Sequence, residues 1–258
     1  MKFYLISGEA SGDLHGANLI KAIKQLRPEA QFTGIGGDQM QGQGMRLLRH
    51  YNTFAVMGLV DVLKKLPLIW RTLQETKKNI AQEKPDGIIL IDFSGFNLKI
   101  AQWAHQLGIC VHYYIAPQVW ASRSKRVSKI KAYVDHVYAI LPFETDFYRR
   151  YGLEVTYVGH PLLDALTEKE ITPKAAFLDR NQLDQTPIIA LLPGSRKQEI
   201  SAILPVMLAT AQQFPEYQWV IAQAPGVEDD FYNSFVGSMP QVHRCKNDTY
   251  SLLNYSHL

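Results

Sequence analysis

The sequence has little of several features that would assign a protein to a special class. It contains two cysteines in 258 residues, Cys110 and Cys245, and their spacing fits no zinc motif. Both are expected to be reduced structural thiols. The formal net charge is only +3. That value argues against nucleic acid as a partner, because proteins that bind it over a large surface are usually more basic.

Long apolar runs are also missing. No stretch approaches the roughly 18 apolar residues that a membrane span needs. The N-terminal run, Met-Lys-Phe-Tyr-Leu-Ile-Ser-Gly, is too short for a signal peptide and enters a turn at once. The sequence therefore predicts a cytoplasmic protein without a membrane span.

Short apolar runs alternate with longer helical patterns along the first part of the chain. Helical patterns at 16–25 and 98–106 are examples. This alternation predicts an α/β fold with a mostly parallel sheet covered on both faces, whose ligands bind beyond the carboxyl ends of the strands. The candidate strands are 3–6, 31–35, 87–91, 110–115, 136–141 and 155–158.

The alternation stops at about residue 160 and then resumes. A strand at 188–192, a helix at 199–213 and a strand at 218–222 follow, with a third strand at 241–244. We predict an N-terminal domain at 1–160, a hinge at 161–172 and a C-terminal domain at 173–258. Doubly wound sheets commonly have about five or six strands, so the second domain is expected to be small or cut short.

Two acidic segments lie at predicted carboxyl ends of strands. Residues 8–16 read Gly-Glu-Ala-Ser-Gly-Asp-Leu-His-Gly, and glycines before a helix suit close approach of an anion. In that loop Ser11 or Asp13 could instead be a plain helix cap. Asp92 follows four aliphatic residues, so it is a candidate general base or, equally, a cap of the next helix.

Three further segments have alternative interpretations. Aromatic residues at 113–120 precede a basic cluster that includes Arg123 and Arg126, which suits an anionic ligand or a solvated helix face. The apolar stretch at 54–70 suits membrane contact or burial. The turn at 193–196, with Glu199 after it, suits a diphosphate or is an ordinary strand-to-helix turn. It lacks the Lys-Ser/Thr ending of a P-loop, which argues against hydrolysis of a nucleoside triphosphate.

Eight short segments, in order from about residue 4 to residue 200, together resemble the lipid-A-disaccharide synthase family of inverting GT-B glycosyltransferases. The resemblance implies two Rossmann-like domains with doubly wound parallel sheets, the second incomplete in this chain. The segments are Gly8-Glu9-Ala10-Ser11-Gly12-Asp13, Gly34-Ile35-Gly36-Gly37 with Met40, Val56-Met57-Gly58, Asp92 with Phe96-Asn97, Pro117-Gln118-Val119-Trp120, Leu141-Pro142-Phe143-Glu144 with Phe147-Tyr148, Val158-Gly159-His160-Pro161, and Leu192-Pro193-Gly194-Ser195-Arg196.

The resemblance implies a reaction that joins UDP-2,3-diacylglucosamine to 2,3-diacylglucosamine 1-phosphate and releases UDP. Asp92 would be the base, and Asp13, Glu9 or His15 would orient or assist it. Arg196 would stabilise the charge on UDP. No metal is expected, because arginine and helix amides can carry that charge and the sequence has no dense carboxylate cluster. No cofactor is expected, because the UDP-sugar is a substrate. The implied substrate-binding residues are Gly8, Ser11, Gly12, Asn97, Gln118, Trp120, Arg123, Arg126, Gly194, Ser195, Arg196 and Glu199.

The same resemblance implies acylated glucosamine lipids as partners and a peripheral position on the anionic cytoplasmic face of a bacterial inner membrane. The chain departs from the family at Ser94, where Pro is usual, and at Ser122, where many members have Trp. Family members also continue well past Leu258, so the unpaired second sheet could drive association into a homo-oligomer. The alternatives are a truncated, non-catalytic binding relative and another GT-B UDP-sugar enzyme.

Overall fold

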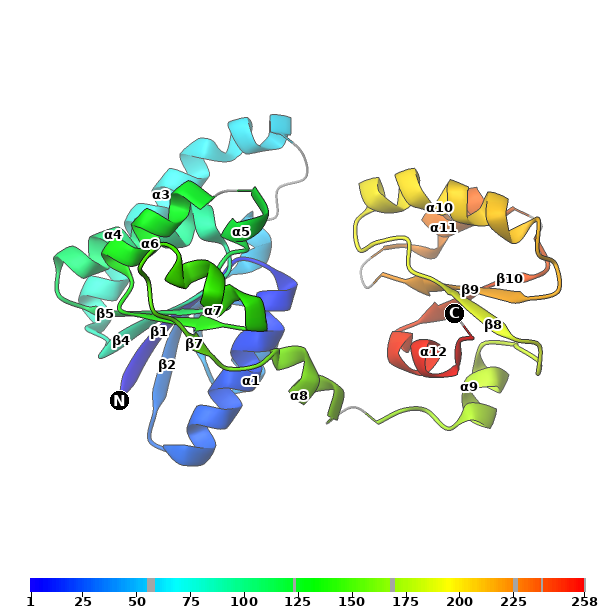
Figure 1. Cartoon of the computed structure of the whole chain (residues 1–258), viewed down its shortest axis with the longest axis horizontal. Helices are drawn as coiled ribbons and strands as arrows, with labels where there is room; N and C mark the ends of the chain where they lie inside the picture. The colour runs from blue at the N-terminus through cyan, green and yellow to red at the C-terminus, as the bar shows by residue number, and fades with distance from the viewer. Residues whose placement is uncertain (55–58, 123, 168–169, 225–226, 238, 258) are drawn as a thin grey trace. The chain divides into compact units, whose positions relative to one another are not determined.

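A computed structural model describes the chain except residues 55–58, 123, 168–169, 225–226, 238 and 258, and except the side chains of 54, 59–66, 122, 165 and 167. The chain divides into two compact units, Met1–Glu168 and Lys169–Leu258 (Figure 1). The division falls inside the predicted hinge. Most of that hinge forms helix α8 (Pro161–Thr167), which contacts α1 (Ala10–Leu26) and therefore belongs with the first unit.

The first unit contains a seven-stranded parallel sheet in the order β3-β2-β1-β4-β5-β6-β7. Each strand forms at or within a residue or two of a predicted apolar run, except β3. That strand was not predicted because its sequence, Arg-Leu-Leu-Arg-His, contains only two apolar residues in a row. In the structure none of its five residues is buried. The strands are β1 (Lys2–Ser7), β2 (Gln31–Gly36), β3 (Arg46–His50), β4 (Gly87–Ile91), β5 (Cys110–Tyr114), β6 (His136–Ala139) and β7 (Thr156–Tyr157).

Strand β4 shows how helices cover both faces of this sheet, since all five of its residues are buried. Ile89 and Ile91 pack with residues of α1 on one face. Ile88 and Leu90 alternate with them and pack on the other face with α3, α4 and α6. The remaining helical segments are α2 (Asp38–Gly42), η1 (Tyr51–Phe54), α3 (Leu59–Glu83), α4 (Ser94–Gln106), α5 (Val119–Ser122), η2 (Ser124–Arg126), α6 (Val127–Tyr133) and α7 (Pro142–Arg149).

The second unit contains a three-stranded parallel sheet in the order β10-β9-β8. Strand β9 (Gln218–Gln223) is buried along its whole length, with α10 and α11 on one face and α9 and α12 on the other (Figure 1). The C-terminal segment forms α12. The other elements are α9 (Lys174–Arg180), β8 (Ile188–Leu191), α10 (Lys197–Ala211), α11 (Asp229–Val236), β10 (Val242–Lys246) and α12 (Thr249–Tyr255).

Among the described residues, no helix combines the length and the apolar character needed to cross a bilayer. Most of the apolar stretch at 54–70, residues 54–66, lies outside the described side chains, so the structure bears on the choice between burial and contact only at 67–70. There Leu68 and Trp70 are exposed, Trp70 to 64%.

Candidate functional site

Two loops meet at the carboxyl edge of the first sheet. One follows β1 and contains Gly8, and the other follows β4 and contains Phe93, while Gly12 lies in the first turn of α1. A Cβ atom on Gly8 would overlap the Phe93 ring, and one on Gly12 would overlap the Ser7 hydroxyl. Glycine at position 8 therefore lets the two loops approach each other, and glycine at position 12 lets the start of α1 pack against Ser7. This is a packing role for two residues that we predicted to bind substrate.

Asp92 ends β4 in a left-handed backbone conformation. Its φ is 42°, and Phe93 follows with a φ of 45°. Two consecutive residues of this kind without glycine are strained, and the surrounding structure must hold them. The Asp92 carbonyl accepts hydrogen bonds from Tyr113 Oη at 2.7 Å and from Asn97 Nδ2 at 2.8 Å. Asn97, which was predicted to bind substrate, is buried, and its side-chain amide holds the backbone of Asp92 in place.

The environment of Asp92 suits a group that takes up a proton. Burial raises the pKa of the Asp92 carboxyl, and the negative charge of Glu9 raises it further. A base in an enzyme works best when its pKa approaches the working pH, so the direction of this shift favours proton abstraction. Glu9 and Asp92 thus lie close enough to interact, since they follow the neighbouring strands β1 and β4.

The side chain of Asp13 is held by the backbone at the start of α2. It is 2% exposed, and its carboxylate accepts hydrogen bonds from three backbone N–H groups, of Gly37 at 2.7 Å and of Gln39 and Met40 at 3.1 Å each. Its side chain therefore anchors the start of α2 to α1. The alternative that Asp13 or Ser11 caps α1 is wrong, since the cap residue is Glu9.

His15 lies two residues further along α1 and is half-buried. Burial lowers its pKa, and the nearby His160 lowers it further, so the ring is held neutral. Its Nδ1 atom is buried and has no hydrogen-bond partner within the described part of the chain. His15 thus faces the Val-Gly-His-Pro segment before α8 and not Asp13.

The aromatic and basic residues after β5 separate into two groups. Trp120 Nε1 donates to Glu144 Oε1 at 3.2 Å, and Glu144 is buried at the start of α7. Arg126 donates instead to the hydroxyl of Ser94, beside Asp92. Gln118 is exposed, and Arg123 lies outside the described residues.

Glu144 belongs to one of the eight family segments, but the sequence analysis did not place it among the site residues. Its other oxygen accepts hydrogen bonds from the N–H groups of Ile140 at 3.0 Å and Leu141 at 2.9 Å. Proline followed two residues later by glutamate marks a helix start, and that signal was present at Pro142. What the signal could not show is that the same carboxylate holds Trp120.

In the second unit, the turn between β8 and α10 already contains an anion of its own. Gly194 has a φ of 120°, which lets the chain turn back over the start of α10. The Glu199 carboxylate accepts hydrogen bonds from the backbone N–H of Ser195 at 3.0 Å and of Arg196 at 3.3 Å, and from the Arg196 guanidinium at 3.1 Å. The Ser195 N–H and the other contacts lower the pKa of Glu199, so the group stays charged.

A comparison with known proteins places these features in a family. The family described as lipid-A-disaccharide synthetase matches residues 3–257. The chain belongs to this family. Among curated lipid-A-disaccharide synthases, the protein of Trichlorobacter lovleyi is 42% identical over 230 residues, 88% of this chain and 60% of that protein. A Coxiella burnetii protein is 36% identical over 257 residues, 98% of this chain and 68% of that protein.

This lipid-A-disaccharide synthetase family member therefore spans about 60 to 68% of the length of these relatives. Solved structures confirm the fold. UDP-GlcNAc 2-epimerase of Neisseria meningitidis superposes with a TM-score of 0.67 at 13% sequence identity. The match covers 100% of this chain and 76% of the epimerase chain. The Methanocaldococcus jannaschii enzyme has a TM-score of 0.68 at 14% identity over all of this chain and 78% of its own. The predicted family and the GT-B type α/β fold are both confirmed.

Proposed function

We propose that this family member acts as a glycosyltransferase on lipid-linked sugars, joining UDP-2,3-diacylglucosamine to 2,3-diacylglucosamine 1-phosphate with release of UDP. The observation that carries this proposal is Asp92, whose backbone is fixed at the carboxyl edge of the sheet by Tyr113 and Asn97. A parallel sheet gathers its ligands at this edge. The buried environment that raises the pKa of Asp92 is the one a general base needs.

In the proposed reaction, Asp92 removes the proton of the acceptor 6-hydroxyl as its oxygen attacks the anomeric carbon. The bond from that carbon to the UDP oxygen breaks, and the configuration inverts. Arg126, hydrogen-bonded to Ser94 two residues from Asp92, supplies a cation for the acceptor phosphate. Asp13 and Asn97 act as positioning residues, because their contacts are with backbone.

The turn at Gly194–Arg196 is proposed to receive the diphosphate of the donor. Backbone N–H groups at a helix start and a guanidinium are the usual partners of such a group. The Glu199 carboxylate accepts from the same donors, so a diphosphate must share or replace it. No metal is needed for this scheme, since Arg196 and the N–H groups can carry the leaving charge.

Contact with the anionic cytoplasmic face of the membrane is part of the same proposal. The exposed side chains of Leu68 and Trp70 on α3 support it, because an amphipathic helix with an exposed tryptophan suits the lipid interface. Acylated substrates would reach the enzyme from that surface.

The direct test measures UDP released by the purified chain with each lipid substrate alone and with both. We expect release only when both are present, with the disaccharide 1-phosphate detected by mass spectrometry. Binding of the acylated acceptor without any release would replace the proposal by a non-catalytic binding role. Conversion of a UDP-sugar into its epimer would indicate another UDP-sugar enzyme.

Replacing Arg196 with alanine is expected to weaken UDP binding by about 10-fold or more, because a hydrogen bond to a charged group contributes roughly 1.5–3 kcal/mol. Isothermal titration with UDP measures it. Arg149, an exposed arginine in an ion pair with Asp146 in the first unit, provides the matched control as Arg149→Ala. Equal affinity of the two variants would remove Arg196 from the donor site.

A further inference from the structure

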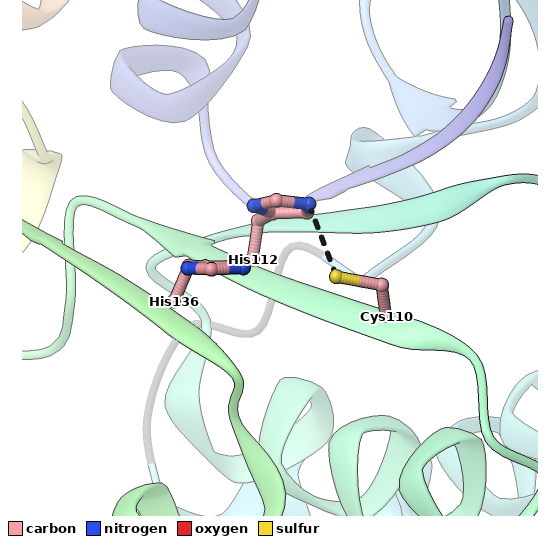
Figure 2. Close-up of side chains that lie close together, drawn as sticks. All are labelled: Cys110, His112 and His136. Atoms are coloured by element: carbon pink, nitrogen blue, oxygen red, sulfur yellow. Dashed lines mark hydrogen bonds between the residues drawn. The ribbon is translucent and has the colours of Figure 1, made fainter.

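Three side chains with metal-binding atoms meet at the start of β5 and β6. Cys110 and His112 are the first and third residues of β5, so they point to the same face of the sheet. His136 is the register partner of His112 on β6. Figure 2 shows the two rings one above the other with the Cys110 sulfur beside His112. The cluster belongs to the amino ends of the strands, whereas Asp92 belongs to the carboxyl ends.

The distances within this cluster match those around a metal ion. Cys110 Sγ lies 3.4 Å from His112 Nε2, and one ligand atom from each residue falls within 4.8 Å of the others. Tetrahedral zinc with bonds of about 2.3 Å to sulfur and about 2.0 Å to nitrogen places those two ligands roughly 3.5 Å apart. Within the described residues, no second group of three such side chains is this close.

The ring of His112 is oriented for the role. Its Nδ1 atom lies 3.1 Å from the hydroxyl of Tyr138, which can accept the Nδ1 proton. The lone pair of Nε2 then faces the Cys110 sulfur. A second hydrogen bond of this kind fixes the tautomer in most histidine ligands of metals.

The neighbouring strand leaves room beside the cluster. Gly87, the register partner of Cys110 on β4, has no side chain, and a Cβ there would touch the His112 ring at 3.4 Å. His136 is exposed, so its ring can turn towards the other two and an ion can enter from solvent. The rings of His112 and His136 are stacked with centroids 4.9 Å apart, so such a turn is needed.

We propose that Cys110, His112 and His136 form a binding site for Zn²⁺ or a similar borderline-soft divalent cation, with water as the fourth ligand. Sulfur and imidazole donors select such ions over Mg²⁺ or Ca²⁺. The thiol releases its proton to solvent on binding, and the thiolate and both imidazoles donate to the ion. The site would tie β5 to β6 away from Asp92, so it concerns stability and not the transfer reaction.

Cobalt provides the test, because a thiolate bound to Co²⁺ gives a charge-transfer band in the near ultraviolet. We expect the full chain to bind one Co²⁺ with that band and to release it when Zn²⁺ is added. Cys110→Ser should abolish the band, and His112→Ala and His136→Ala should each weaken Zn²⁺ binding at least 10-fold. His105→Ala removes an exposed histidine elsewhere in the first unit and should change neither measurement.

Alkylation of the unaltered protein gives a second measurement that does not depend on the variants folding. Zn²⁺ should protect Cys110 from a thiol reagent, as read by mass spectrometry of its peptide, while EDTA restores the reaction. The absence of a charge-transfer band, or alkylation of Cys110 unaffected by Zn²⁺, would overturn the proposal. The cluster would then be an ordinary hydrogen bond between the Cys110 thiol and the His112 ring, with the His136 ring stacked on His112.

Discussion

Asp92→Asn is expected to lower UDP release by about 100- to 10,000-fold, the range that removal of a general base usually gives. Asparagine is the right replacement because it has nearly the same shape and tolerates the left-handed conformation that Asp92 adopts with a φ of 42°. Alanine would add backbone strain to the loss of the carboxylate. The hydrogen bonds from Tyr113 and Asn97 go to the backbone carbonyl, so the variant keeps them.

The control for this variant is Asp146→Asn, which changes an exposed aspartate on α7 whose partner is Arg149. It should release UDP at the rate of the unaltered chain. Thermal unfolding by circular dichroism establishes that both variants are folded. If Asp92→Asn released UDP within about 3-fold of the rate of the control at the same substrate concentrations, Asp92 would not be the base.

The pH profile of the unaltered chain tests the same assignment without a substitution. A base works only when deprotonated, so kcat/KM falls as the pH drops through its pKa. Burial and the charge of Glu9 raise the pKa of Asp92, so the acid limb should lie above the pH at which an ordinary aspartate, with a pKa of about 3.9, takes up its proton. Asp92→Asn should lose this limb.

Gly34→Ala is expected to destabilise the first unit by roughly 3 kcal/mol or more, the sum of an overpacking and a backbone term. Gly34 pairs with Leu5 in the register of β2 and β1. A Cβ atom there would overlap the Leu5 carbonyl oxygen and lie 2.9 Å from the Leu5 carbonyl carbon and nitrogen. Backbone atoms of a central strand cannot move aside, because β1 is hydrogen-bonded on both edges.

Hydrogen exchange measured by mass spectrometry reports this loss unit by unit. Peptides from β1 and β2 should exchange faster in Gly34→Ala, while those from β8 and β9 keep their rates. Gly42→Ala is the matched control, because a Cβ on Gly42 meets nothing within 4 Å and alanine favours a helix by roughly 0.5–1 kcal/mol. Unchanged exchange in Gly34→Ala would mean that the two strands separate there more easily than their register implies.

The sequence predicted the position of Asp92 because four aliphatic residues before it define a buried strand whose end is marked by the first polar residue. It could not predict the left-handed turn or the support of Tyr113, which comes from β5. The role of Asp13 was also out of reach, because its partners at Gly37, Gln39 and Met40 lie 24 to 27 residues away along the chain. Contacts of this kind depend on the order of the strands in the sheet, and a short stretch of sequence does not show that order.

The metal-binding cluster illustrates the same limit from another side. The spacing of the two cysteines fits no zinc motif, so Cys110 gave no sign of a zinc site. His136 joins the other two only because it pairs with His112 across β5 and β6. The register of neighbouring strands, which the sequence alone did not define, decides which side chains meet. Strand β3 was missed for a related reason, since its half-exposed residues carry no apolar run.

The carboxylate of Glu199 gives the turn before α10 a property that an empty helix start would lack. Because this turn holds a negative charge before any ligand arrives, a diphosphate that binds there exchanges one anion for another. The net change in charge at the turn is smaller than for simple addition, so the affinity should depend less steeply on salt. The displaced carboxylate can return as the nucleotide departs, and the turn then favours release of UDP over its retention.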